Sequence, residues 1–511
     1  MAKSIINILF ILLFQVAHGQ NKHWIYFTNK GEIDTSIQVI SERTIQNRIR
    51  QNLPLIQLTD YPLNQEYLDS LKYYHVKVVS QSRWLNAVSA TIDSEMLEPL
   101  STLDFVQEVQ PLTSTIYLTT SSSVKVSQLG FALEQINGQV LIEQGLNGAG
   151  VSVGIIDGGF LKADQHKSLE RFFEQNLVKG YRDYITPQSE PYSGVEALDD
   201  AHGTQVWQML GGFNSSKDIQ FGLATHAYYY LARTDHGKDE RRREEDFWIA
   251  AMEWMDSCGV QVINSSLGYT KGFDNPKENY LPQQMDGKST AITRAAQIAA
   301  SQKGIFMVIS AGNDGNDKDW LVLSAPADAK DVLSVGATRF KYWDKASYSS
   351  IGPEFLPYLK PNISCFSSKG TSFSAPIMTG LVACLLQQDS SFSNQQIIEL
   401  IEKAGHLYPY GNNYLGYGVP DARKILQLMS GENLFPDEPK TLYPKGKKVT
   451  LKFPDYPYDY AILFHKKDKI NVVAQEIITS DQNKMKIIRP QNVNYTSVAS
   501  KDEVLEIIWK Q

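Results

Sequence analysis

Short apolar runs recur through the middle of the chain, and stretches with helical spacing separate them. The runs are rich in β-branched residues and nearly free of polar ones, which is typical of strands buried on both faces of a sheet. Strands that alternate with helices build a parallel sheet covered on both faces. The pattern therefore predicts a doubly wound, mainly parallel α/β domain. The predicted strands are 151–156, 228–232, 260–264, 305–309 and 332–336, and two of the helices are 247–257 and 292–301.

The region before this domain, about 100 residues long, has a different pattern. Four short stretches read as strands, and two longer ones have apolar residues on one helical face. Strands interleaved with two helices over this length predict a small α+β sandwich of the ferredoxin-like type. The predicted strands are 24–28, 76–80, 86–92 and 105–109, and the predicted helices are 41–51 and 64–74.

From about residue 430 the pattern changes again. Prolines interrupt any helical periodicity, and Val449, Leu451 and Phe453 alternate with polar residues. Parts of 460–466 and 485–488 alternate in the same way. A period of two predicts half-buried strands, so a small β-rich domain is expected here. It could be a secretion-sorting tail or a plain stabilising domain.

The first residues predict export. Lys3 precedes the apolar stretch 5–16, and Ala17 and Gly19 supply small residues where a signal peptidase cuts. The stretch is too short to span a bilayer and no later run reaches about 18 apolar residues, so no transmembrane segment is expected. The protein is expected to be secreted, periplasmic or at the cell surface. The predicted divisions are 1–19 for a signal peptide, 20–120 for the α+β domain, 121–429 for the α/β domain and 430–511 for the β-rich domain.

Charge and cysteine content exclude several classes of function. The chain has 49 Lys and Arg against 56 Asp and Glu, a net charge of −7, without a large basic patch, so nucleic acid is not an expected partner. Cys258, Cys365 and Cys384 cannot all pair internally, and no spacing fits a zinc site. No cofactor is expected. The oxygen-rich turn 314–319 leaves a structural calcium ion open, although a solvated turn is the simpler interpretation.

Ser372 stands at a turn where an apolar helix is predicted to begin. Gly370 and Thr371 precede it, and the apolar run 377–386 follows shortly after. A hydroxyl held at such a turn lies close to backbone N–H groups and to the positive end of the helix dipole, which suits a nucleophile. A Ser/Thr cluster in this place can also be an N-cap. The choice depends on whether the chain offers a base, an acid and oxyanion donors.

Two residues fit the acid and the base. Asp157 ends the buried strand 151–156 and is followed by two glycines, and active sites of open α/β sheets gather at the carboxyl ends of strands. His202 precedes Gly203 and apolar residues at helical spacing, so it stands at a helix start with room for neighbours. A turn aspartate and a structural histidine are the alternative interpretations.

A fourth residue fits the oxyanion donor. Asn313 follows the strand 305–309 in a glycine-rich loop, which directs its side-chain amide toward the same edge of the sheet. An ordinary Asn-Asp-Gly turn is the alternative.

Together, Asp157, His202, Asn313 and Ser372 occur in an order that resembles the subtilisin-like serine proteases, the subtilases. The segment Ser266-Leu267-Gly268 resembles the substrate-binding segment of that family. The resemblance covers about 290 residues. It implies a subtilisin-like fold and a secreted serine endopeptidase that hydrolyses peptide bonds through an acyl-enzyme.

The resemblance also implies a role for each part. Asp157, His202 and Ser372 would form the catalytic triad, with Asn313 as oxyanion donor. Ser266, Leu267 and Gly268 would bind a protein or peptide substrate. The domain 20–120 would be a propeptide that inhibits its own protease, although a permanent accessory domain is also open. The alternative function is a catalytically silent protein of the same fold that acts as a binding or adhesion module.

Overall fold

The computed structural model describes residues 21–34, 39–111, 115–116, 130–195, 200–235, 241–271, 278–435, 439–452, 459–480 and 484–509. The predicted signal peptide, 1–19, lies outside these residues. Contacts divide the chain into two compact units, one of Met1–Ile33 with Pro62–Leu112 and one of Asp34–Tyr61 with Thr113–Gln511. Each unit is described separately below.

The first unit is a four-stranded antiparallel sheet with two helices that share its core. The strand order is β2-β3-β1-β4, and every neighbouring pair is antiparallel. Ile25 and Val88 of the sheet pack with Leu68 and Leu71 of helix α2. The predicted ferredoxin-like sandwich is confirmed. The strands are β1 (Asn21–Phe27), β2 (Lys77–Ser82), β3 (Ala87–Ile92) and β4 (Val106–Pro111), and the helices are α2 (Gln65–Tyr73) and α3 (Leu97–Ser101).

One predicted helix belongs elsewhere. Helix α1 (Glu42–Arg50) forms where 41–51 was expected, and Ser41 caps it by accepting a hydrogen bond from the backbone N–H of Thr44. However, α1 belongs to the second unit, and the short helix α3 is the second helix of the sandwich. The buried residues of α1 are polar, namely Thr44, Asn47 and Arg48. Periodicity predicts that a helix forms, but not which core it joins.

The second unit is built on a seven-stranded parallel sheet in the order β15-β14-β13-β11-β6-β10-β7. All five predicted strands are present. The two further strands, β7 and β15, lie at the edges, and β7 alternates half-buried with exposed residues instead of forming an apolar run. The strands are β6 (Ser152–Asp157), β7 (Val178–Asp183), β10 (Tyr228–Arg233), β11 (Val262–Ser265), β13 (Phe306–Ser310), β14 (Leu333–Thr338) and β15 (Ile363–Phe366).

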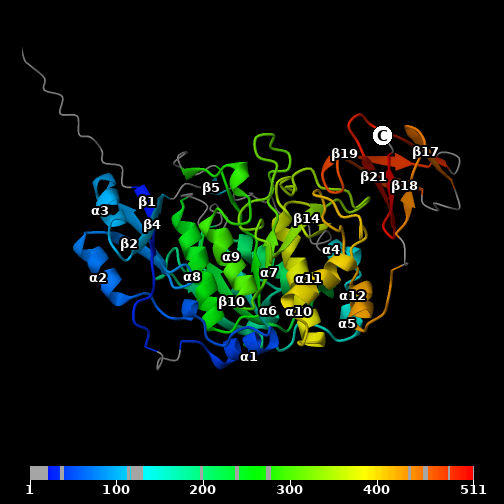
Figure 1. Cartoon of the computed structure of the whole chain (residues 1–511). Helices are drawn as coiled ribbons and strands as arrows, with labels where there is room; N and C mark the ends of the chain where they lie inside the picture. The colour runs from blue at the N-terminus through cyan, green and yellow to red at the C-terminus, as the bar shows by residue number, and fades with distance from the viewer. Residues whose placement is uncertain are drawn as a thin grey trace, which may run out of the picture. The chain divides into compact units, whose positions relative to one another are not determined.

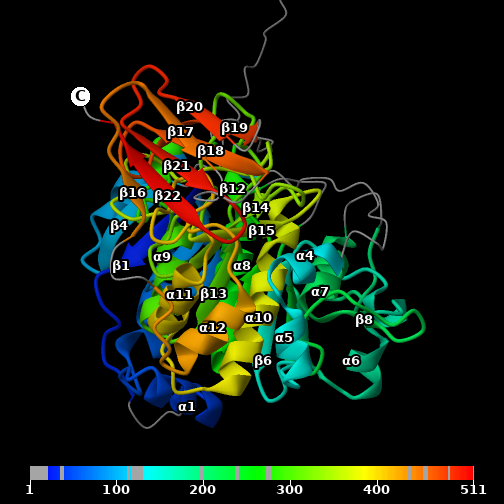
Figure 2. The same cartoon turned by 90° about the vertical axis from the view of Figure 1, so that its right-hand side faces the viewer.

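Helices cover both faces of this sheet (Figure 1, Figure 2). α8 packs against α9 on one face, and α7 packs against α10 on the other. The twelve residues Ala375–Leu386 of α10 are all buried, which explains their continuous apolar character. The helices of this part of the chain are α4 (Gly130–Gln135), α5 (Gln139–Glu143), α6 (Glu170–Glu174), α7 (His202–Gly211), α8 (Arg243–Ser257), α9 (Ala291–Ser301), α10 (Ala375–Gln388), α11 (Asn394–Lys403) and α12 (Ala422–Met429).

The C-terminal part of the second unit is rich in strands, as expected. A five-stranded sheet in the order β16-β22-β21-β18-β19 shares a core with the antiparallel pair β17-β20. Phe464 and Val472 pack with Leu407 and Leu415 of the α/β part. The strands are β16 (Thr441–Leu442), β17 (Lys448–Lys452), β18 (Tyr460–Lys466), β19 (Val472–Thr479), β20 (Lys484–Ile488), β21 (Tyr495–Ala499) and β22 (Val504–Ile508).

Among the residues that the structure describes, no helix combines the length and the apolar character needed to cross a membrane.

Candidate active site

The site lies where the strand order of the parallel sheet changes direction. β6 is the first strand of the sheet, and later strands are added on both sides of it. Crevices at the carboxyl ends of strands on either side of such a point are the usual binding sites of open α/β sheets. β6 ends at Asp157, and its neighbour β11 ends at Ser265. The predicted acid and the predicted substrate-binding segment therefore lie at the carboxyl ends of neighbouring strands.

Asp157 and His202 form a buried pair at this edge. His202 is the first residue of α7, and its Nδ1 lies 2.6 Å from Oδ1 of Asp157. The same carboxylate oxygen accepts a hydrogen bond from the backbone N–H of Gly158 at 2.8 Å. A carboxylate can only accept, so Nδ1 is the donor and the lone pair of the neutral imidazole is on Nε2. The ring is thus held in the tautomer that suits a general base.

Gly203 makes this approach possible. A Cβ added at Gly203 would lie 2.5 Å from the carbonyl oxygen of Gly159 and 2.9 Å from Cβ of Asp157. Any side chain there would push the start of α7 away from the loop that follows β6. The interpretation that glycine leaves room beside the histidine is confirmed.

Ser372 lies in a short helical turn, Thr371–Phe373, directly before α10. Its Oγ lies 3.2 Å from the carbonyl oxygen of Ser266, and Oγ of Ser266 donates in return to the carbonyl of Ser372 at 2.8 Å. The ring of the next residue, Phe373, has its centroid 5.6 Å from that of His202. The structure therefore brings the serine segment, the histidine and the substrate-binding segment together.

The N-cap alternative does not hold for this cluster. The residue at the N-cap of α10 is Ser374, and its side chain makes no capping hydrogen bond. Its hydroxyl instead donates to the carbonyl of Cys365 at 3.3 Å. Ser372 stands two residues further out and caps nothing either, because Gly370 occupies the N-cap of its own turn.

Asn313 contacts the loop that carries Ser372. Its Oδ1 accepts from the backbone N–H of Thr371 at 2.8 Å, and Oγ1 of Thr371 also lies 3.2 Å from it. The hydroxyl of Thr371 in turn accepts from the N–H of Gly312 at 3.0 Å. These contacts fix the orientation of the amide, because only its oxygen can accept from an N–H. The Nδ2 group, with both donors, is the other branch of the amide.

The segment Ser266–Gly268 follows β11 and continues into the short strand β12 (Tyr269–Thr270). Leu267 is buried, and a Cβ at Gly268 would lie 2.1 Å from Oγ of Ser324. β12 pairs in antiparallel fashion with β5 (Thr115–Ile116), a pairing that the sequence did not predict. The extended residues of β5 therefore lie beside β12, the strand that directly follows the predicted substrate-binding segment.

Asp235 is a buried carboxyl group of this site that the sequence interpretation missed. It follows β10, and the neighbouring Thr234 donates its N–H to the carbonyl of Asp157 at 3.1 Å. Burial, together with the charge of Asp157, raises the pKa of Asp235 to about 7, although hydrogen bonds from Thr234 and Tyr269 oppose the shift. Its position, just beyond a predicted buried strand, is the same signal that identified Asp157.

Two carboxylates of the oxygen-rich turn next to Asn313 have contacts of their own. Asp317 forms an ion pair with Lys271 at 2.5 Å. Burial and the nearby charge of Asp317 raise the pKa of Asp314 to about 6. Across the described part of the chain, no group of three or more His, Cys, Asp or Glu side chains could hold a metal ion.

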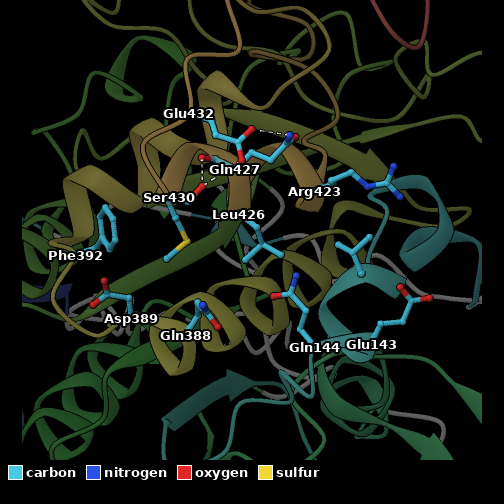
Figure 3. Close-up of a pocket in the computed structure, with 12 residues that line it drawn as sticks. Glu143, Gln144, Gln388, Asp389, Phe392, Arg423, Leu426, Gln427, Ser430 and Glu432 are labelled. Carbon is cyan, nitrogen blue, oxygen red and sulfur yellow. Dashed lines mark hydrogen bonds between the residues drawn. The ribbon is translucent and has the colours of Figure 1, made fainter.

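A pocket of about 620 Å³ lies away from these residues (Figure 3). It is lined by side chains of α5, α10 and α12, including Gln388, Asp389 and Arg423. Gln388 ends α10, whereas Ser372 precedes the start of that helix. Fourteen helical residues span roughly 20 Å. The pocket is thus separate from the candidate active site.

Comparisons with known proteins agree with this geometry. Residues 148–418 match the subtilase family, Peptidase S8, and residues 22–126 match the Peptidase S8 propeptide domain of Bacteroidota. Subtilisin NAT of Bacillus subtilis subsp. natto is 25% identical over 361 residues, which are 69% of this chain and 83% of that protein. Minor extracellular protease Epr of Bacillus subtilis is 24% identical over 346 residues, 64% of this chain and 47% of Epr.

Solved structures share the fold. The epidermin leader peptide processing serine protease of Staphylococcus aureus matches with a TM-score of 0.56 and 17% identity, over 80% of this chain and 99% of that one. Fervidolysin of Fervidobacterium pennivorans, described as a keratinolytic enzyme related to subtilisin, matches with a TM-score of 0.52 and 16% identity, over 94% of this chain and 70% of that one.

These findings define a serine-type endopeptidase that carries an N-terminal propeptide domain and is therefore made as a zymogen. The chain belongs to the subtilase family, because the match to that family, residues 148–418, spans more than half of the sequence. The predicted resemblance and fold class are confirmed.

Proposed function

We propose that this chain is a secreted subtilase zymogen that hydrolyses peptide bonds through a triad of Asp157, His202 and Ser372. The observation that carries the proposal is the buried hydrogen bond of 2.6 Å between Asp157 and His202, directly beside the turn that holds Ser372. A pair of this kind next to a serine is the arrangement that activates a hydroxyl nucleophile.

In the proposed mechanism, Nε2 of His202 takes the proton from Oγ of Ser372 as that oxygen attacks the scissile carbonyl carbon. The protonated imidazole then gives this proton to the leaving amine, and an acyl-enzyme forms. Water attacks the acyl-enzyme with His202 again acting as base, which releases the acid and restores the serine. Asp157 keeps the ring in the required tautomer and stabilises the imidazolium. No step requires a metal ion or another cofactor.

The oxyanion would be held by Nδ2 of Asn313 and the backbone N–H of Ser372. The anchoring of Oδ1 of Asn313 on Thr371 supports this role, because a fixed amide costs no reorganisation when charge develops on the substrate oxygen.

Asn313→Ala is expected to lower kcat by about 10²- to 10³-fold with little change in KM, because the lost donor acts mainly in the transition state. That magnitude was measured in a subtilisin. Steady-state kinetics on a peptide substrate, with Asn316→Ala as the control, measures it; Asn316 is an exposed residue of the same turn and should behave like wild type. An unchanged kcat in Asn313→Ala would remove Asn313 from the site.

The substrate is proposed to be an extended protein or peptide segment that lies along Ser266, Leu267 and Gly268. Extended segments bind by adding a strand to an exposed backbone edge. The pairing of β5 with β12 supports this mode, since residues 115–116 fall within the matched propeptide region and occupy the adjoining edge. The propeptide would then inhibit the protease as an occupant of its own substrate groove.

Export is proposed from the leader 1–19 and from the relative that is named as extracellular. The division into a propeptide of 20–120, a catalytic domain of 121–429 and a β-rich domain of 430–511 remains a prediction. Mass spectrometry of the mature N-terminus tests both the leader and the propeptide boundary.

Labelling with a fluorophosphonate tests the proposed function most directly. Once the propeptide is removed, wild-type protein should form a covalent adduct at Ser372, and Ser372→Ala should not. Ser374→Ala is a matched control two residues away and should label like wild type. Absence of label in wild type as well would favour the catalytically silent binding protein, and label in Ser372→Ala would assign the nucleophile to another residue.

A further inference from the structure

The segment between β1 and α2 forms an arm that packs on the α/β part of the second unit. It consists of α1 and the residues after it, which end in the turn Leu58–Asp60 (Figure 1). In sequence the arm is an insertion in the propeptide domain, because the propeptide match runs from 22 to 126. Its contacts, however, place it with the protease.

A buried cluster of charges joins the arm to the protease. Asp60 accepts from both Nη1 and Nη2 of Arg48, at 2.6 and 2.8 Å, within the arm. The same carboxylate accepts from Nζ of Lys303 at 2.8 Å, and Nη2 of Arg48 lies 3.6 Å from Asp256. Lys303 follows α9, and Asp256 lies in the last turn of α8. The side chains of Arg48, Asp60 and Lys303 are fully buried, and Asp256 is 2% exposed.

The carboxylate of Asp60 remains ionised into acid solution. Burial alone would raise the pKa of Asp60, but the hydrogen bonds from Arg48 and Lys303 lower it to about 2. The carboxylate therefore keeps its charge, and its hold on both cations, down to strongly acid solution.

Neutral contacts extend the interface along the arm. Oγ1 of Thr44 donates to the carbonyl of Asp256 at 2.6 Å. Gln51 and Asn394 are linked by two hydrogen bonds, both of 2.9 Å, one of them to the backbone N–H of Asn394. A Cβ at Gly259 would lie 2.5 Å from Cγ of Arg43, so the protease surface is shaped closely to the arm.

The protease surface that the arm contacts lies at the opposite end of the strands from the candidate active site. Nη1 of Arg43 donates to Oγ of Ser152, the first residue of β6, whereas Asp157 is the last. Five residues along a strand span roughly 17 Å. The arm therefore contacts the amino ends of the strands, and the proposed triad lies at their carboxyl ends.

We propose that this surface is a second binding site for the propeptide, which keeps the propeptide attached to the protease after the connecting chain is cut. A cut after residue 111 leaves the arm on the propeptide side of the break. Dissociation then requires Asp60 and Arg48 to leave Lys303 and Asp256, and the neutral hydrogen bonds of the arm must break in the same step. Blocking the substrate groove and holding the propeptide are thus done at two separate places.

The inference rests on the propeptide domain that the family match shows, and not on catalysis by Ser372. The test therefore uses the full chain from residue 20 with Ser372→Ala and a recognition sequence for a site-specific protease inserted within 117–128. After cutting, size-exclusion chromatography should show the propeptide eluting with the protease, and competition with labelled propeptide fragment gives the dissociation constant.

Asp60→Asn is expected to raise that dissociation constant by about 100-fold, because Arg48 and Lys303 lose their shared counter-charge. Asp69→Asn is the matched control. Asp69 is an exposed propeptide carboxylate paired with Lys72, and its loss should change the constant by less than about twofold. Equal constants for the two variants, or a wild-type propeptide that separates at once after cutting, would overturn the proposal.

A milder variant covers the case in which Asp60→Asn does not fold, as judged by thermal unfolding. Gln51→Ala removes two neutral hydrogen bonds to Asn394 without leaving a charge unpaired, and it should raise the dissociation constant by about 5- to 20-fold. No change in that variant would contradict the proposal equally. Failure of fluorophosphonate labelling would leave this result untouched, so the two proposals fail independently.

Discussion

His202→Ala is expected to lower kcat by about 10⁶-fold, and Ser372→Ala by a similar factor, a magnitude taken from a subtilisin. Without the imidazole, nothing within the proposed mechanism accepts the proton of Oγ as the bond to the substrate forms. Without Oγ, the imidazole has no nucleophile to activate. Single-turnover assays with a chromogenic peptide, on protein whose propeptide has been removed, measure both.

The double variant His202→Ala with Ser372→Ala distinguishes a triad from two independent contributions. Residues that act as a unit are strongly non-additive, so the double variant should be no slower than either single one. Losses that multiply would show that the two residues act separately, and a fall of only about tenfold in either single variant would contradict the assignment. Thermal unfolding checks that each variant is folded.

Asp157→Asn is expected to lower kcat by about 10⁴-fold. The carboxylate accepts from Nδ1 of His202 at 2.6 Å and from the N–H of Gly158 at 2.8 Å through one oxygen. A neutral amide in this place would not stabilise the imidazolium, and in the orientation that turns its NH₂ group toward Nδ1 of His202 it would favour the wrong tautomer. The pH profile of kcat/KM on a peptide substrate should lose the wild-type plateau near neutral pH.

Asp235→Asn is the comparison for this experiment. Asp235 is also buried beside the pair, but its hydrogen bonds in the structure run from Thr234 and Tyr269. Its replacement should change kcat by less than about tenfold. If Asp235→Asn were as slow as Asp157→Asn, the acid that orients His202 would have to be reassigned.

The sequence was most informative where burial leaves a local pattern. β6 and β13 are short apolar runs because both faces of a central parallel strand are covered, and both strands were predicted. β7 was missed because an edge strand exposes residues such as Lys179 and Arg182, which removes that pattern. Polar residues that directly follow such a run could be identified as site candidates. Asp235 also follows a predicted strand, but the sequence interpretation did not include it.

The sequence by itself determined the central strands, several of the helices and the polar residues that stand at their ends, since these depend on periodicities of two to four residues. Only the tertiary structure decided which of these residues meet. Asp157 and His202 are 45 positions apart, and Lys303 meets Asp60 across 243. Helix α1 shows the difference most clearly. Its ends follow from Ser41 and local spacing, but its buried Thr44 donates to the carbonyl of Asp256, 212 positions away. Such pairings depend on shape and charge complementarity in the folded protein, and this complementarity produces no periodic pattern in the sequence.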